Sequence, residues 1–446
     1  MTYIPHTTAE RDEMLSAVGA KSLDDLFSHL PADVKAPPLT LQLGLGEMEL
    51  SAEMARRARK NRSAAELPCF LGAGAYDHFI PPVVDQLILR GELFTAYTPY
   101  QPEISQGILQ IIYEFQTMVA SLTGCDVSNA SLYDGATAAV EGCQMAMRHT
   151  GRTTLVIDGA IHPHYIQTCQ SLLRVQGATL EVISPKASDY RSDVKALAAA
   201  VNDKVAGVVT GYPNFYGSIE DISPLAAAAH ASGALLVSVS NPFAFGLLQP
   251  AGSLGADIVC GEAQALGVPL QFGGPYLGYI TCKNEIVRRM PGRLVGQTLD
   301  VKGQRAFTLT LQAREQHIRR EKATSNICTN TALCAMMAHF YMCCLGRTGL
   351  KRAGELSVAK ADLLRQKLRK ARDVVAVPDY PVFNEFVIET SKPAAQILEA
   401  MLHAGILGGL DLGAYDKARA NQVLVAVTEK RSEEEIDRYV EAMAGA

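Results

Sequence analysis

The sequence lacks the features that mark several large classes of protein. No apolar run approaches the roughly 18 residues that a membrane-spanning helix needs. The first residues, MTYIPHTTAERDE, have no cationic start followed by an apolar core, as a secretory signal would. The 46 Asp and Glu residues outnumber the 41 Lys and Arg residues, which gives a net charge of −5, and there is no basic run. We therefore expect a cytoplasmic protein that binds neither membranes nor nucleic acid.

The cysteine pattern also lacks the spacing of a metal site or a redox motif. Ten cysteines are scattered without a C-x-x-C pair, and Cys343 and Cys344 are adjacent, so they cannot easily bind one metal ion together. Cys125, Cys143 and Cys169 fall in apolar, helix-like segments. This pattern favours buried thiols in a reducing compartment, with no metal bound.

What is present is a long alternation of helix-like and β-rich segments within 446 residues, of which 48% are hydrophobic. Continuous apolar strands separated by helices are typical of a mainly parallel sheet covered on both faces, which predicts a large αβα domain. The expected helices are 108–123, 135–149, 164–176, 191–202 and 221–232, and the expected strands are 154–158, 205–211, 234–239, 256–260 and 278–282.

The two ends of the chain differ from this central pattern. Residues 1–65 predict an N-terminal helical arm, with candidate capping boxes at Thr7 with Glu10 and at Ser22 with Asp25. Residues 331–446 predict a small C-terminal α+β domain, which leaves 66–330 for the large domain. The small domain should contain helices 331–346, 354–372, 393–403 and 432–444 and strands 374–377, 383–390 and 422–428.

The segment FTAYTPYQPEISQG, residues 94–107, is the first candidate for a functional loop. Pro99 and Pro102 exclude a regular helix or strand, and ordered polar loops often carry sites. The alternative is a solvated connector that buries a few tyrosines. The candidate site residues in this loop are Tyr97, Thr98, Tyr100, Gln101, Glu103, Ser105 and Gln106.

Four segments give the chain a resemblance to a known family. GAGAYDHFIPP (72–82), ILQIIYEFQTMVASLTG (108–124), NASLYDGATAAVEG (129–142) and REQHIRREKATSNICTN (314–330) resemble the glycine cleavage system P-protein, a glycine decarboxylase that depends on pyridoxal phosphate (PLP). The resemblance extends over roughly residues 1–440, and the length is similar to that of the separate alpha subunit, subunit 1, of the two-subunit form. It implies the fold of fold-type I PLP enzymes.

A fold-type I enzyme holds PLP as an imine on a lysine, and no lysine occurs here between Lys204 and Lys283. When the chain is aligned on the Pro-x-x-x-Gly-Gly-Pro ending at 269–275, the family's His-Lys pair falls on Ala263 and Gln264. A glutamine amide is not nucleophilic and forms no imine. Gln264 therefore predicts that PLP is not bound covalently to this chain.

Two further features that PLP needs are missing. The strand that should carry an acid for the pyridine nitrogen offers Ser238, Ser240 and Asn241 instead. At the helix start that should receive the phosphate, Asp134 precedes Gly135, and its carboxylate would cap the helix and repel a phosphate.

The resemblance then implies a subunit that is not catalytic alone. A sister subunit carries PLP and decarboxylates glycine, and the aminomethyl group passes to the lipoyl group of the carrier H-protein. The loop 94–107 would reach the shared site in a heterotetramer. Two alternatives remain open: a stand-alone fold-type I PLP lyase or aminotransferase with an unusual anchor, or a non-catalytic scaffold that docks a lipoyl carrier.

Two further groups are candidates for contact with a partner. His162 follows strand 154–158 at a place where a ring can stack on PLP, although a hydrogen-bonded structural histidine is the more common case. Arg319, Arg320 and Lys322 form either an exposed helix face balanced by nearby glutamates or an interface strip for the sister chain or the carrier.

Overall fold

The computed structural model describes residues 5–35, 40–96, 98–186, 189–271 and 273–445. The chain divides into two compact units, Met1–Arg62 and Ser63–Ala446. In the first unit, helices α1 and α2 are Thr8–Ala17 and Glu47–Ala58. The expected capping box is present at α1, because the Thr7 N–H donates to the Glu10 carboxylate at 2.7 Å and the Glu10 N–H donates to Thr7 Oγ1 at 3.3 Å. The boundary expected between large and small domains at residue 330 stays a prediction.

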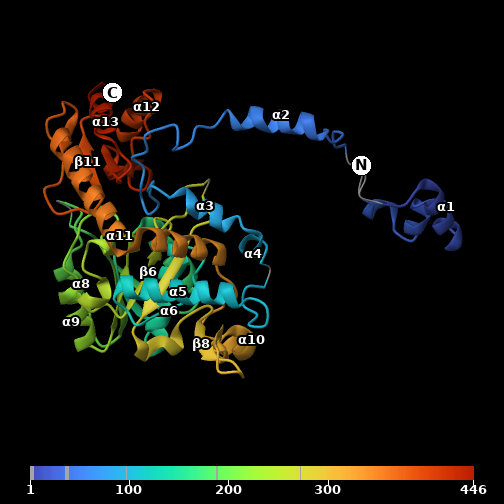
Figure 1. The fold of residues 1–446 in the computed structure, drawn as a ribbon. Helices are drawn as coiled ribbons and strands as arrows, with labels where there is room; N and C mark the ends of the chain where they lie inside the picture. Colours follow the sequence, from blue (N-terminus) through green and yellow to red (C-terminus); the bar gives the residue numbers. More distant parts are fainter. Residues whose placement is uncertain (1–4, 36–39, 97, 187–188, 272, 446) are drawn as a thin grey trace. The chain divides into compact units, whose positions relative to one another are not determined.

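The second unit is built around a seven-stranded sheet with strand order β1-β7-β6-β5-β4-β2-β3 (Figure 1). The five strands from β3 to β6 in this order are parallel, whereas β7 is antiparallel to both of its neighbours. The expected mainly parallel sheet is therefore confirmed. The strands are β1 (Val127–Ser128), β2 (Thr154–Asp158), β3 (Thr179–Ile183), β4 (Val205–Gly211), β5 (Leu235–Val239), β6 (Ile258–Glu262) and β7 (Gly278–Cys282).

Helices cover both faces of this sheet because alternate strand residues point to opposite sides. Val208 of β4 and Leu236 of β5 join one buried cluster, while their neighbours Val209 and Val237 join another. The first cluster includes residues of α5, α9 and α11, and the second includes residues of α6 and α7. The helices are α3 (Pro82–Ile88), α4 (Gly91–Phe94), α5 (Gln106–Thr123), α6 (Gly135–Thr150), α7 (Pro163–Arg174), α8 (Val194–Ala200), α9 (Ser223–Ala231), α10 (Gln316–Arg319) and α11 (Ala332–Leu368).

The C-terminal part forms a four-stranded sheet of order β10-β11-β13-β12, in which every neighbouring pair is antiparallel. α11 consists of two helical arms that meet at a kink at Gly346, whose φ of 58° suits glycine. The expected end of the first helix at residue 346 is therefore confirmed, whereas the second arm begins before the expected residue 354. A hairpin of β8 (Val295–Leu299) and β9 (Arg305–Leu309) was not predicted. The remaining elements are β10 (Val374–Ala376), β11 (Glu385–Thr390), α12 (Ala394–His403), β12 (Leu410–Asp411), β13 (Gln422–Ala426) and α13 (Glu433–Gly445).

The cysteines are free thiols, and their burial only partly follows the expectation. Cys143 and Cys169 are buried, but Cys328, Cys343 and Cys344 are exposed, so the expectation of buried thiols is wrong for these three. The adjacent pair lies on a stretch of α11 just before the kink where the helix faces solvent. Within the described ranges, no three His, Cys, Asp or Glu side chains are placed to hold a metal ion. No described helix combines the length and apolar character needed to cross a membrane.

Candidate functional site

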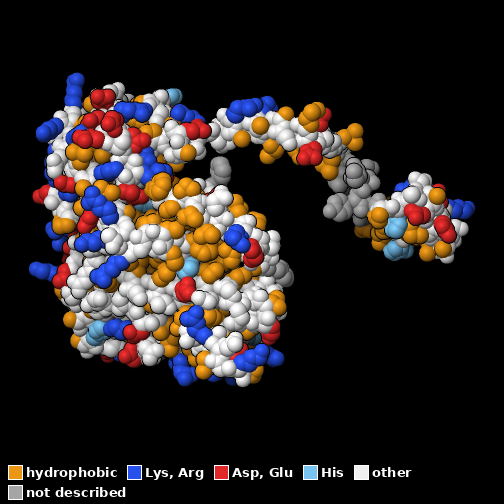
Figure 2. All heavy atoms as spheres, in the orientation of Figure 1, with side chains coloured by type: hydrophobic (Ala, Val, Ile, Leu, Met, Phe, Trp, Pro, Cys, Tyr) orange, Lys and Arg blue, Asp and Glu red, His pale blue; other side chains and the backbone are white. Residues whose placement is uncertain are grey.

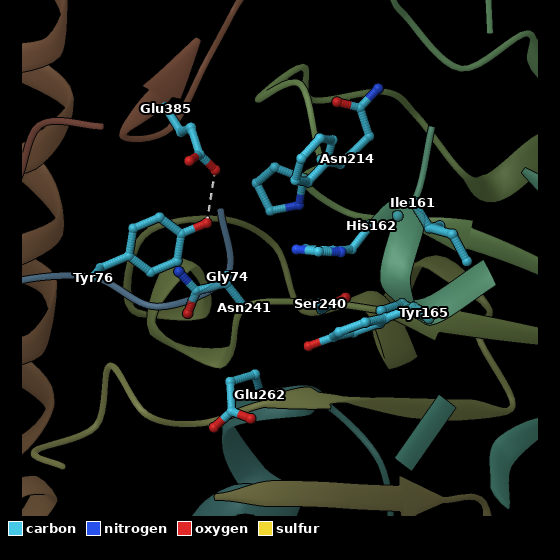
Figure 3. Close-up of a pocket in the computed structure, with 14 residues that line it drawn as sticks. Gly74, Tyr76, Ile161, His162, Tyr165, Asn214, Ser240, Asn241, Glu262 and Glu385 are labelled. Carbon is cyan, nitrogen blue, oxygen red and sulfur yellow. Dashed lines mark hydrogen bonds between the residues drawn. The ribbon is translucent and has the colours of Figure 1, made fainter. Parts of the chain in front are cut away.

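A cavity of about 70 Å³ lies at the carboxyl ends of the parallel strands. In sheets of this kind ligands bind at that edge, because the loops that leave the strands converge there. Figure 3 shows the side chains that surround the cavity. Among the lining residues, His162, Asn214 and Asn241 follow β2, β4 and β5, and Glu262 ends β6. The other polar lining residues, which come from other segments, include Tyr76, Tyr165 and Glu385.

Glu262 ends β6 and occupies the amino terminus of α6. One carboxylate oxygen accepts from the Gly135 N–H at 3.0 Å, and the other accepts from the backbone N–H groups of Gln264 at 3.0 Å and Leu277 at 2.8 Å. Burial raises the pKa of Glu262 to about 7, against the lowering effect of these hydrogen bonds. The carboxylate thus takes the place where the start of a helix would bind an anion.

Glu385 reaches the same cavity from β11 of the small sheet. Its carboxylate accepts from the Ala73 N–H at 2.6 Å and from the Tyr76 hydroxyl at 2.8 Å, as Figure 3 shows for the tyrosine. Full burial raises the pKa of Glu385 to about 7. The small sheet therefore contributes an acidic group directly to the edge of the large sheet.

His162 forms one wall of the cavity and is neutral. Burial lowers the pKa of His162 to about 4. Its Nδ1 accepts from the His164 N–H at 3.0 Å, which caps α7, and its ring stacks on Tyr165 with 5.1 Å between centroids. Phe215 packs edge-on against the same ring at 4.7 Å. His162 is therefore both a hydrogen-bonded structural residue and a lining residue of the cavity.

Gln264, at the position expected for the lysine, is 2% exposed and fully hydrogen-bonded. Its Oε1 accepts from the Tyr76 N–H at 2.8 Å. Its Nε2 donates to the carbonyl oxygens of Tyr76 at 3.2 Å and Val268 at 2.6 Å. The amide therefore fastens the Tyr76 segment to the turn after β6, a structural role that needs both ends of the amide.

These residues do not fit PLP. The cavity of about 70 Å³ is small beside the roughly 300–1,000 Å³ of sites that enclose a drug-sized molecule. At the phosphate position, a carbon added to Gly135 would lie 2.1 Å from the Tyr165 hydroxyl, and Glu262 already occupies the Gly135 N–H. Asp134 caps α6 by accepting from the Thr137 N–H at 2.7 Å, as its sequence position indicated.

The loop 94–107 is held together by its own polar side chains. Ser105 Oγ donates to the Thr98 carbonyl at 2.9 Å, and Thr98 Oγ1 donates to Gln101 Oε1 at 3.2 Å. Ser105 is buried, so its hydroxyl closes the loop and does not face solvent. Tyr97, which was also predicted in this site, lies outside the described residues.

A second cavity, of about 550 Å³, joins this loop to the last of the family-like segments. Thr98, Tyr100 and Gln101 line it together with Thr329 and Asn330 of the segment 314–330. Burial raises the pKa of Tyr100 to about 12, so its hydroxyl stays protonated and able to donate. Two polar segments more than 200 residues apart in sequence thus face one space of ligand size.

Glu103 and Gln106 lie on a different side of the loop. Both line a cavity of about 570 Å³ beside the β8–β9 hairpin. Gln106 is tied to β9, because its Nε2 donates to the Phe307 carbonyl at 2.9 Å and its Oε1 accepts from the Phe307 N–H at 2.8 Å. Glu103 is exposed.

The basic segment forms a third, separate group. Arg319 and Lys322 line a cavity of about 420 Å³ with Arg288, Arg289 and Arg314. Arg319, Arg320 and Lys322 are exposed, as the first alternative expected, but they do not share one helix face, because α10 has only 4 residues and ends at Arg319. Arg314 is buried and donates to backbone carbonyls. Arg320 directly follows α10 with a φ of 52°.

The predicted site residues therefore fall in several places, and sequence reasoning missed most of the strand-edge cavity. Glu262 carries a usable signal, since it ends a buried strand at the edge where ligands bind. Asn214 and Asn241 follow β4 and β5 in the same way. Tyr76 and Glu385 carry no such signal, because only the tertiary fold brings them to this edge.

Comparison with known proteins decides the family. Residues 1–443 match the family described as glycine cleavage system P-protein. The chain belongs to this P-protein family. The fold-type I arrangement expected from the sequence is confirmed by a solved P-protein structure, glycine decarboxylase of the glycine cleavage system in inhibitor-bound form, with 42% identity, a TM-score of 0.89 and 100% coverage of both chains.

Curated P-protein relatives match over nearly their whole length. A probable glycine dehydrogenase (decarboxylating) subunit 1 of Listeria monocytogenes serotype 4b (strain F2365) is 46% identical over 445 residues, covering 100% of this chain and 99% of the relative. The protein of the same name from Geobacillus kaustophilus (strain HTA426) is 48% identical over 439 residues, covering 98% of this chain and 97% of the relative.

Proposed function

We propose that the chain is the alpha subunit of a heteromeric glycine dehydrogenase (decarboxylating) and is not catalytic alone. The full-length match to relatives named as subunit 1 supports this role. One observation carries the proposal that the sister subunit, and not this chain, holds PLP. Gln264 stands where an imine-forming lysine would be needed, and its amide is hydrogen-bonded to Tyr76 and Val268. The same observation speaks against a stand-alone PLP lyase or aminotransferase.

In this proposal PLP is held by a sister subunit, subunit 2, which supplies the electron sink for decarboxylation of glycine. The lipoyl group of the H-protein receives the aminomethyl product. The alpha subunit contributes the polar cavity of the loop 94–107, in which Tyr100 and Gln101 orient bound groups and exclude water. Association into a heterotetramer and a cytoplasmic location belong to the same proposal.

The surface of the second unit supports a protein partner. Figure 2 shows hydrophobic side chains gathered on the face that carries α3, α5 and α11. Val83, Leu89 and Phe94, on or next to α3 and α4, are 44%, 56% and 57% exposed, and Ile104 of the loop is 72% exposed. Contiguous exposed apolar side chains mark interaction surfaces, because their transfer from water stabilises a complex. This face lies beside the loop that we assign to the shared site.

The proposal is tested by reconstitution. The purified chain, a lysine-bearing sister subunit and lipoylated H-protein are assayed alone and mixed, by glycine-dependent exchange of labelled carbon dioxide. We expect activity only when both subunits are present, with a maximum at an equimolar ratio. Full activity of the sister subunit without this chain, or activity of this chain alone, would reject the proposed division of labour.

A further inference from the structure

The strand-edge cavity and a smaller cavity beside it are each lined by a buried donor that has no partner among the described residues. Asn241 Oδ1 accepts from the Phe243 N–H at 3.1 Å, which fixes the amide orientation and leaves Nδ2 buried without a hydrogen bond among the described residues. Asn384 is 3% exposed, and its Nδ2 is also unpartnered within the described chain. Asn384 lines an adjoining cavity of about 30 Å³ that shares Asn241, Tyr76 and Glu385 with the first. Buried donors normally have partners, so this pair points to an acceptor supplied from outside.

The same space has an acidic side. Glu262 and Glu385 both line the cavity, and none of the described lining residues is a lysine or an arginine. Among the described residues, each carboxyl is bonded only to uncharged donors, so no positive charge in that part of the chain balances it. Figure 3 shows Glu385 and Glu262 on opposite sides of the space, with the rings of Tyr76, His162 and Tyr165 between them. Carboxylates and aromatic faces together suit a small ammonium group.

We propose that this cavity binds a small zwitterionic amino acid, with its ammonium toward the glutamates and its carboxylate toward the amides of Asn241 and Asn384. The volume of the cavity favours a small ligand. About 70 Å³ corresponds to roughly five water-sized positions, about as many as glycine has non-hydrogen atoms. The amino acids that match this volume best are therefore those with no side chain or a very small one.

The distribution of charge selects this ligand class over an anion. A phosphate or a PLP molecule would face the carboxyl groups of Glu262 and Glu385 and the occupied N–H of Gly135. A zwitterion instead supplies an ammonium group that balances the glutamates and a carboxylate that accepts from the asparagine amides. Because Glu385 lies on β11 and Glu262 on β6, the bound ligand bridges the small sheet and the large sheet. Binding therefore stabilises the folded chain by mass action.

The site is independent of the proposed enzymatic role, since it is tested on the full chain without the sister subunit. Isothermal calorimetry and thermal unfolding are measured with glycine as the probe, and with methylammonium, acetate, valine and PLP as comparisons. Glycine should bind and raise the unfolding temperature. Methylammonium and acetate, which each carry only one of the two charged groups of glycine, should bind at least tenfold more weakly. Valine and PLP should not bind. Weak or equal binding of all probes, or absence of any glycine effect at millimolar concentration, overturns the proposal.

Two variants test whether the ligand binds in this cavity. Asn241→Asp keeps the oxygen that accepts from Phe243 but removes the unpartnered donor, and Glu385→Gln removes the charge with little change of shape. Each should weaken glycine binding at least tenfold. Glu389→Gln, at an exposed position of the same strand, is the matched control and should bind as the parent does. If Glu385→Gln does not fold, Asn241→Asp decides the question. Unchanged glycine binding by Asn241→Asp contradicts the proposal.

Discussion

The change Glu385→Gln should make the stability of the protein less dependent on pH. Burial raises the pKa of Glu385 from 4.5 to about 7, which means that the folded chain binds this proton more tightly than the unfolded chain does. The stabilisation is fully present below the unfolded pKa near 4.5 and is lost as the pH rises through about 7. Glutamine keeps the acceptor oxygen but has no proton to lose.

The magnitude follows from the same two values. A pKa rise from 4.5 to about 7 corresponds to about 3 kcal/mol of differential stability. Between about pH 4 and about pH 8, the free energy of unfolding of the parent protein should therefore fall by about 3 kcal/mol more than that of Glu385→Gln. Glu262, which has the same pKa of about 7, remains in both proteins and cancels in the comparison.

The assay is urea unfolding without added ligand, followed by circular dichroism at several pH values across this range. Glu389→Gln, which changes an exposed carboxyl on the same strand, serves as the control and should follow the parent. The reasoning is refuted if the parent and Glu385→Gln lose stability in parallel. It is also refuted if Glu385→Gln loses more stability than the parent as the pH rises.

Four other substitutions test the candidate sites. Gln264→Lys should lower the free energy of unfolding by about 2–5 kcal/mol, measured in urea, because it leaves buried backbone groups unpaired, and added PLP should give no imine absorbance. Gln106→Ala should lower it by about 1–2 kcal/mol and speed proteolysis within 94–107, since two hydrogen bonds to Phe307 are lost. Tyr100→Ala and Gln101→Ala, in the cavity assigned to the shared site, should each lower kcat/KM of the reconstituted enzyme at least about tenfold; unchanged kinetics would remove that residue from the site.

The regular elements were predictable because each carries a local signal. The strands 154–158, 205–211 and 278–282 have the predicted bounds, since their apolar runs are continuous and buried on both faces. The cap at Asp134 was equally visible, because a carboxylate before a helix start has one obvious use. The break at residue 346 was also predicted as the end of a helix, although the second arm of α11 starts earlier than residue 354.

The candidate site was predictable only where one segment carries the information. Gln264 was found because a single missing lysine changes the chemistry of the whole family pattern. The pairing of Tyr76 with Glu385 depends on how β11 meets the large sheet, and no periodicity specifies that meeting. The burial of Arg314 was missed for the same reason, because its partners are carbonyls of a distant turn.

The most direct test of the central claim is to find which chain fixes PLP. The two subunits are incubated with PLP separately and mixed, reduced with borohydride, digested and analysed by mass spectrometry. Since Gln264 forms no imine, the pyridoxyl group should appear only on a lysine of the sister subunit. A pyridoxyl group attached to any side chain of this polypeptide would contradict the account.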